Sequence, residues 1–196
     1  MADFGLWFRT GLTHILDPGG LDHIFYIMVL VLPFGFRQWK SLLWLVTAFT
    51  LGHSLTLALS TFGWLKVKAS WVEVCIAATI SISCWFNLSE LKKQLFRLPK
   101  RYLLATLFGC IHGLGFSFLL RSMLGSEGEV LWPLLAFNLG LEAGQCLILI
   151  TVMGGKLLLN AVWPDKENIV TTTISFVILL LSLFYIYQRI QLILES

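Results

Sequence analysis

Charged residues are scarce in this sequence, because Asp, Glu, Lys and Arg together make up only 13% of its 196 residues. Apolar residues make up 57% and the mean hydropathy is +0.82, whereas an ordinary soluble protein is about half apolar and a quarter charged. This composition excludes a disordered chain, a secreted disulfide scaffold and an ordinary soluble enzyme. It predicts an integral membrane protein, and the length favours a single transmembrane domain over residues 1–196.

The sequence also lacks the patterns of several functional classes. No basic cluster is interleaved with aromatic residues, which excludes a nucleic-acid partner, and no nucleotide-binding motif is present. The first residues do not fit a typical signal peptide, since they include Asp3 and Arg9 and lack a long apolar core. The cysteines form neither a CxxC pair nor a disulfide framework, so we interpret them as structural thiols: Cys75, Cys84, Cys110 and Cys146.

Continuous apolar runs predict about six transmembrane helices, because a helix needs about 20 mainly apolar residues to cross a bilayer. The runs do not alternate as the strands of a membrane barrel do. The predicted fold class is therefore an all-α polytopic membrane protein. The expected spans are residues 21–36, 42–62, 71–89, 102–121, 131–153 and 169–187.

Residues 1–20 precede the first span and carry the apolar pattern of an amphipathic helix, which Asp17-Pro18-Gly19-Gly20 should end. Two placements of this segment are open. It can lie in the membrane interface as an anchor, or it can be a re-entrant segment that brings His14 and Asp17 to a site.

Basic residues are more numerous in one set of connecting segments than in the other. Because basic loops stay in the cytoplasm, we expect the 90–101 loop inside and both termini outside, in a bacterial cytoplasmic membrane. The basic residues on the predicted inner side are Arg37, Lys40, Lys92, Lys93, Arg97, Lys100, Arg101, Lys156 and Lys166.

Ionisable residues within apolar spans are costly, and they indicate a functional site. All four histidines of the chain lie in or beside the predicted spans. His14, Asp17, Asp22 and His23 gather at the outer end of the first span, where imidazole and carboxylate groups suit a metal site. Asp22 alone could equally cap the start of a helix.

A second, deeper group of polar residues is predicted near the middle of the membrane. His53 and His112 lie at similar depths in the second and fourth spans, and Glu142 lies at that depth in the fifth. A single histidine there is most simply a core residue, but two histidines and a carboxylate together favour a metal site. Four further residues are expected to support it, although Glu73 could also be a solvated carboxylate: Ser54, Glu73, Asn138 and Gln145.

A faint repeat relates two of these segments, because Phe49-Thr-Leu-Gly-His53 resembles Phe108-Gly-Cys-Ile-His112. A parallel repeat of helix pairs would explain it. The ligands are nitrogen and oxygen atoms, a set that suits nickel, cobalt, zinc or manganese better than Cu(I).

Five ordered segments of the chain together resemble the HupE/UreJ family: HILDPGGLDHIFYI, LVTAFTLGHSLTLAL, VEVCIAATISIS, LFGCIHGLGFSFLL and FNLGLEAGQ. The resemblance implies a small inner-membrane protein of the kind associated with hydrogenase and urease gene clusters and regarded as nickel or cobalt permeases. His14 is farther from the Asp-His pair than in the usual first motif of the family. The family's motif residues fall on His14, Asp22, His23, His53, Glu73, His112, Asn138, Glu142 and Gln145.

We favour the hypothesis of a transporter for a divalent transition metal, with membrane lipid and the metal ion as partners. The ion would be collected outside by Asp17, Asp22 and His23, with Glu73 as a further candidate. It would be held at depth by His53, His112 and Glu142. Because six helices are few for a transporter, a homo-oligomer is expected.

Two alternatives stay open at this point. One is an intramembrane zinc hydrolase that cleaves a lipid or peptide bond, with Glu142 or Asp22 as the general base. The other is a metal sensor or assembly chaperone that binds its ion without transport or turnover.

Overall fold

The computed structural model describes residues 3–89, 98–124, 130–164 and 166–195. Within these ranges the secondary structure is helical and contains no strand, which confirms the all-α prediction. The elements are α1 (Phe4–Leu16), α2 (Asp22–Val31), the 3-10 turn η1 (Phe36–Gln38), α3 (Trp39–Thr61), α4 (Ala69–Leu88), α6 (Leu98–Leu124), α7 (Leu131–Val162) and α8 (Glu167–Leu194).

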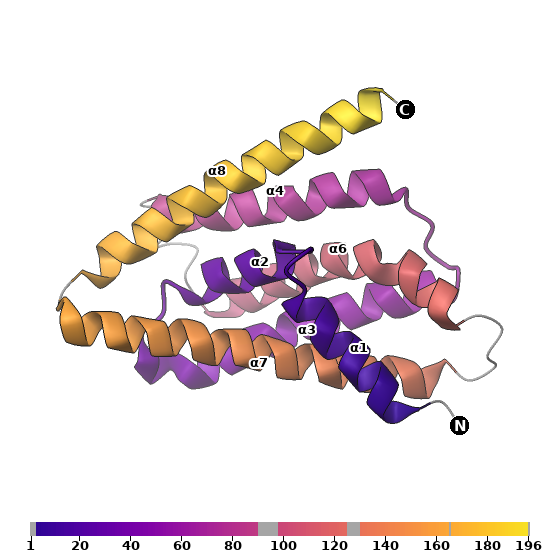
Figure 1. The fold of residues 1–196 in the computed structure, drawn as a ribbon, viewed down its shortest axis with the longest axis horizontal. Helices are drawn as coiled ribbons and strands as arrows, with labels where there is room; N and C mark the ends of the chain where they lie inside the picture. The colour runs from indigo at the N-terminus through magenta and orange to yellow at the C-terminus, as the bar shows by residue number, and fades with distance from the viewer. Residues whose placement is uncertain (1–2, 90–97, 125–129, 165, 196) are drawn as a thin grey trace.

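The long helices run along the long axis of the molecule, and α1 crosses α7 obliquely (Figure 1). Both termini lie at the same end of the bundle, while α4 ends and α6 begins at the opposite end. The most extensive helix contacts are those of α3 with α6, α1 with α7, and α4 with α8.

Within the part of the chain that the structure describes, four helices are long and apolar enough to cross a membrane, namely Phe36–Thr61, Ala69–Leu88, Leu131–Val162 and Glu167–Leu194. They correspond to the predicted spans 42–62, 71–89, 131–153 and 169–187. The predicted span 102–121 lies inside the longer helix α6, which is not among these four.

The predicted span 21–36 differs from the structure, because α2 has only 10 residues. Pro33 explains the early end, because Leu32 before it is still in a helical conformation whereas Pro33 has no backbone N–H with which to continue the hydrogen bonds of the helix. The connection between α1 and α2 is also explained by hydrogen bonds between residues close in the sequence. The backbone N–H of Gly19 donates to the Asp17 carboxylate at 2.9 Å, and Gly20 donates to the Asp17 carbonyl at 3.1 Å. This turn separates α1 from α2.

Helix α1 packs into the bundle through Trp7, Gly11 and Ile15, all of which are buried. Its start is fixed by Asp3, whose carboxylate accepts the backbone N–H of Gly5 at 2.9 Å. Of the two placements considered for this segment, the burial of its α7 face favours the one that brings His14 to a site.

The predicted connection after residue 153 begins later in the structure, because α7 continues to Val162 and therefore contains Lys156. The Lys156 ammonium donates to the carbonyls of Leu32 and Phe34 at 2.7 and 2.6 Å and pairs with Glu167. The last carbonyls of a helix have no partner within it. Lys156 therefore binds carbonyls of the segment that directly follows α2, and it anchors this end of the short helix to α7 and α8.

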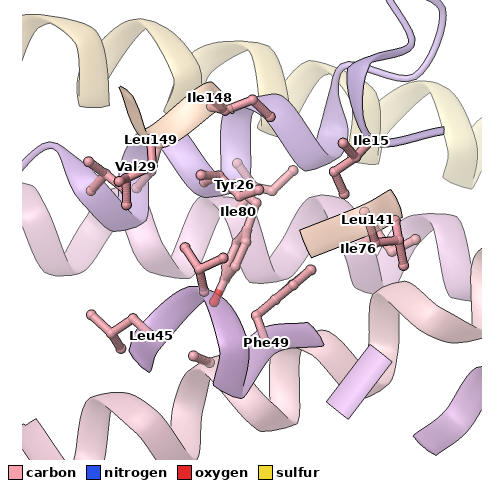
Figure 2. Close-up of a cluster of buried hydrophobic side chains, with 14 of the residues drawn as sticks. Ile15, Tyr26, Val29, Leu45, Phe49, Ile76, Ile80, Leu141, Ile148 and Leu149 are labelled. Carbon is pink, nitrogen blue, oxygen red and sulfur yellow. The ribbon is translucent and has the colours of Figure 1, made fainter. Parts of the chain in front are cut away.

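Apolar side chains fill the space between the helices, and they also cover the outside of the bundle. Figure 2 shows part of the interior, where Tyr26 of α2 lies beside Phe49 of α3. On the outside, Trp44, Leu158 and Phe184 are more than half exposed. Such a surface suits lipid tails better than water.

Candidate metal centre

The fold brings all four histidines together, although they come from four different helices. Ring centroids are 4.8 Å apart for His14 and His23, 5.7 Å for His23 and His53, and 5.1 Å for His23 and His112. His23 is therefore the central member, and the histidines of the predicted outer and deep groups form one cluster. We call these four residues the histidine cluster.

Two features of the backbone bring these rings together. The break after α1 places His14, in the last turn of α1, next to His23, in the first turn of α2. Helices α3 and α6 approach closely at Gly52 and Gly109, where an added Cβ would lie 2.0 and 2.1 Å from a carbonyl oxygen of the other helix. This close crossing allows His53 and His112 to reach the same space.

The hydrogen bonds of His23 and His112 determine which nitrogen of each ring keeps its lone pair. The Thr79 hydroxyl donates to the Ile76 carbonyl at 2.7 Å and lies 3.1 Å from Nε2 of His112. Because this hydroxyl proton is already used, Nε2 of His112 must donate, and its Nδ1 keeps the lone pair. In the same way the Asp22 carboxylate, 3.1 Å from Nδ1 of His23, leaves Nε2 of His23 as the free acceptor.

These free nitrogens are buried and have no hydrogen-bond partner in the described structure. They are Nε2 of His14, Nε2 of His23, both ring nitrogens of His53, and Nδ1 of His112. Leaving so many buried polar atoms unpaired is costly. A cation bound among them would satisfy one nitrogen of each ring. Asp22 and Thr79 would orient two of its ligands, as carboxylates and hydroxyls do around metal-bound histidines.

The spacing of the ligand atoms fits a shared cation. Within the triad His14, His23 and His53, one ligand atom of each residue lies within 4.8 Å of the others, and the same holds for Asp22, His23 and His112. Nitrogen ligands about 2 Å from one ion are roughly 3 to 4 Å apart. Small side-chain rotations would therefore close either triad around a metal, and neutral imidazole is a good ligand for nickel, cobalt or zinc.

Three carboxylates line a cavity next to the cluster, and one of them, Glu73, lies in the second turn of α4, toward the end of the bundle where the termini lie. Asp17, Asp22 and Glu73 share this cavity with His14, His23 and His112. An adjoining cavity shares Asp22 and Glu73 and extends to Arg189, whose side chain pairs with Glu73 at 3.2 Å. We call the two cavities together the vestibule.

The predicted polar residues of α7 lie apart from the histidine cluster. Glu142 accepts a hydrogen bond from Thr47 at 2.6 Å, and Gln145 accepts one from Thr50 at 2.6 Å, so both face α3. The amide oxygen of Asn138 is buried without a partner. Ser54 donates to the Thr50 carbonyl of its own helix at 2.7 Å.

Sequence reasoning missed Thr79 and the aromatic residues that enclose the cluster. Thr79 is buried in an apolar helix, and its only sequence signal is a hydroxyl in a predicted span. The ring of Phe116 lies 4.0 Å from that of His14, and Tyr26 and Phe49 lie 5.2 and 5.1 Å from His112. No periodicity distinguishes these aromatics from ordinary core residues.

A model of the HupE/UreJ protein family matches residues 1–189. The chain belongs to the HupE/UreJ family. No curated protein and no solved structure gave a significant match. The match covers every helix that contributes to the histidine cluster in this HupE/UreJ chain, and it confirms the family resemblance drawn from the five sequence segments.

Proposed function

We propose that this HupE/UreJ protein is a transporter of a divalent transition metal of the nickel or cobalt type in a bacterial cytoplasmic membrane. The observation that carries the proposal is the set of buried, unpartnered imidazole nitrogens in one cluster. The metal ion is the cargo in this proposal.

The vestibule and the cluster differ in charge and in burial, so they would act on the ion in different ways. Carboxylates at the vestibule attract a cation and raise its local concentration. His53 and His112 are fully buried, so they would replace the water of hydration by neutral nitrogen ligands. Neutral ligands bind a divalent ion without the strong charge attraction that would trap it, as release on the other side requires.

We propose six membrane crossings, the first of them discontinuous. Helices α1 and α2 run in the same direction, one after the other, and α3, α4, α6, α7 and α8 supply the others (Figure 1). Half-length helices that meet at a site in the membrane are a recurrent feature of transporters. With the basic connections inside, both termini and the vestibule would face the extracytoplasmic side.

The hydrolase alternative needs a general base next to a metal-bound water. Glu142 is hydrogen bonded to Thr47 and does not line the vestibule, while Asp22 is engaged by His23. Both contacts favour transport over this alternative. A sensor or chaperone would bind the ion without carrying it across the membrane.

Flux into proteoliposomes loaded with a metal-sensitive dye tests the proposal, with Ni²⁺, Co²⁺ and Zn²⁺ supplied in turn. We expect uptake by the native protein and loss of most of it in His53→Ala and His112→Ala. The control is Ser81→Ala, which removes a buried hydrogen bond to Ser182 away from the cluster. Binding of one tightly held zinc with turnover of lipid or peptide, or binding without flux, would contradict the proposal.

A further inference from the structure

The three most extensive helix contacts are related to one another by an exchange of helices. If α1 is exchanged with α6, α3 with α7, and α4 with α8, the contact of α1 with α7 becomes the contact of α6 with α3. The contact of α4 with α8 is unchanged by this exchange. A two-fold axis between α4 and α8 has this effect, and α2 has no counterpart under it.

The close contacts of glycines at the two helix crossings show the same two-fold relation. An added Cβ on Gly140 would lie 2.0 Å from the carbonyl oxygen of Phe8, which is three residues before Gly11. An added Cβ on Gly11 would lie 2.0 Å from the carbonyl oxygen of Phe137, which is three residues before Gly140. The crossing is thus reciprocal.

The crossing of α3 with α6 has the same register. An added Cβ on Gly52 would meet the carbonyl oxygen of Thr106, three residues before Gly109, and one on Gly109 would meet that of Phe49, three residues before Gly52. Gly11 therefore corresponds to Gly109, and Gly140 corresponds to Gly52.

The sequence carries the same correspondence. Phe49-Thr-Leu-Gly52 matches Phe137-Asn-Leu-Gly140, and a histidine follows three residues after Gly11 and after Gly109, at His14 and His112. The repeat expected between Phe49–His53 and Phe108–His112 instead relates two helices that lie side by side and belong to different halves.

The pair α4 and α8 adds independent support near the axis. Thr79-Ile-Ser81 in α4 matches Thr173-Ile-Ser175 in α8. Ser81 hydrogen bonds across to Ser182 of α8 at 2.8 Å, and Ser175 hydrogen bonds across to Asn87 of α4 at 3.2 Å. Each serine of the matched pair thus contacts the opposite helix, as the two-fold axis requires.

Corresponding helices run in opposite directions, since α1, α4 and α7 run away from the end with the termini and α6, α8 and α3 run toward it (Figure 1). The axis is therefore perpendicular to the long helices and lies in the plane of the membrane. Transporters with such inverted repeats alternate access to a central site by exchanging the conformations of their two halves.

A second cavity lies at the end of the bundle opposite the vestibule, between α2, α4 and α6. Its lining includes Tyr26, Ser83, Asn87 and Phe108. Tyr26 and Phe49 stack at 4.7 Å between their ring centroids, and both rings lie next to His112. This aromatic pair separates the second cavity from the histidine cluster.

We infer that the chain is an inverted repeat of α1, α3 and α4 against α6, α7 and α8, and that the second cavity is the closed exit of the ion pathway. When the two halves exchange conformations, the Tyr26–Phe49 pair parts, the second cavity opens to the cluster, and the vestibule closes. The assignment of the second cavity as an exit rests on the proposed transport function, whereas the inverted repeat rests on the helix contacts alone.

Thiol accessibility in a variant without the four native cysteines tests this inference, because it needs no metal. Ala77→Cys lines the vestibule and Ser83→Cys lines the second cavity. An impermeant maleimide is applied to right-side-out and to inside-out membrane vesicles. We expect Ala77→Cys to react from the face of the termini and Ser83→Cys to react from the other.

The decisive measurement adds Tyr26→Ala to each cysteine variant, with Tyr26→Phe as the matched control that keeps the ring. If the halves exchange conformations, labelling at Ser83→Cys rises and labelling at Ala77→Cys falls, each by about 5-fold or more, since one population shift changes both. Phe108→Ala, whose ring also faces Tyr26, repeats the test if Tyr26→Ala does not fold.

A rise at Ser83→Cys with no change at Ala77→Cys would mean a local opening and would overturn the inference, as would labelling of both positions from the same face. Opposite labelling changes in a protein that transports none of Ni²⁺, Co²⁺ and Zn²⁺ would support the inverted repeat and contradict the proposed cargo. Metal flux without opposite changes would support transport and contradict the exchange of halves.

Discussion

At the scale of single residues, the cluster depends on how each imidazole is oriented. Asp22 and Thr79 each occupy one nitrogen of a ring and so direct the other nitrogen toward the shared space. Among the described residues, neither ring nitrogen of His53 has a hydrogen-bond partner. The sequence pointed to the histidines, but it gave no reason to choose Thr79 among the hydroxyl residues of the spans.

Replacing Thr79 by Val should weaken metal binding by about 10- to 100-fold, which is the usual effect of losing a group that orients a metal ligand. The reason is that Nε2 of His112 loses its acceptor, so the ring can rotate or change tautomer. Titration of the purified protein with Ni²⁺ or Co²⁺ measures the change. Thr79→Ser keeps the hydroxyl and should bind like the native protein, and equal loss in both variants would contradict this role.

At the scale of elements, two close helix crossings position the site, and each depends on glycine. Helix α7 also contains Gly154, whose added Cβ would meet nothing within 4 Å. Helix α7 therefore contains both Gly140, which is in close contact with the backbone of α1, and Gly154, which serves as a matched control.

We expect Gly140→Ala to destabilise the protein by about 1 to 3 kcal/mol, because the new methyl group overlaps the carbonyl of Phe8 and forces α1 away from α7. Gly154→Ala should be neutral or stabilise by up to about 1 kcal/mol through helix propensity. Thermal unfolding in detergent, followed by circular dichroism, compares the two. Equal melting temperatures would show that the α1–α7 crossing adjusts without cost.

Helix α2 shows how an element too short to cross a membrane is kept in place. Its polar end carries Asp22 and His23, and its carbonyl end is held by Lys156, which also pairs with Glu167. The position of a site residue at one end of α2 thus depends on a lysine at the other end of the bundle.

At the scale of the whole molecule, both termini lie at one end of the bundle (Figure 1). The vestibule is lined by Glu73 near the start of α4 and Arg189 near the end of α8, which lie toward that end. The distribution of basic residues predicts that this end faces the extracytoplasmic side. The opposite end carries the start of α6 with Lys100 and Arg101.

Fusions to alkaline phosphatase, which is active only outside the cytoplasm, test this orientation. A fusion after the last residue should be active and a fusion after Ser89 should be inactive, while a cytoplasmic reporter such as β-galactosidase should give the opposite pattern. Activity after Ser89 would reverse the orientation and make the vestibule the cytoplasmic entrance.

The sequence alone determined the class of the protein and the identity of its unusual residues. Apolar runs specify membrane helices, and a histidine or carboxylate within such a run is conspicuous, because burial of these groups is costly wherever they lie. The break at Asp17-Pro18-Gly19-Gly20 was also readable, since it depends on local backbone preferences.

Only the tertiary structure decided which polar residues meet, because that depends on how each helix is rotated and where it crosses its neighbours. The crossings at the paired glycines turn His53 and His112 toward His23, while Glu142 and Gln145 face Thr47 and Thr50 instead. The ten-residue α2 likewise keeps its place through Lys156, which is 124 positions from Leu32 in the chain. No local pattern encodes such contacts, since they join residues far apart in the sequence.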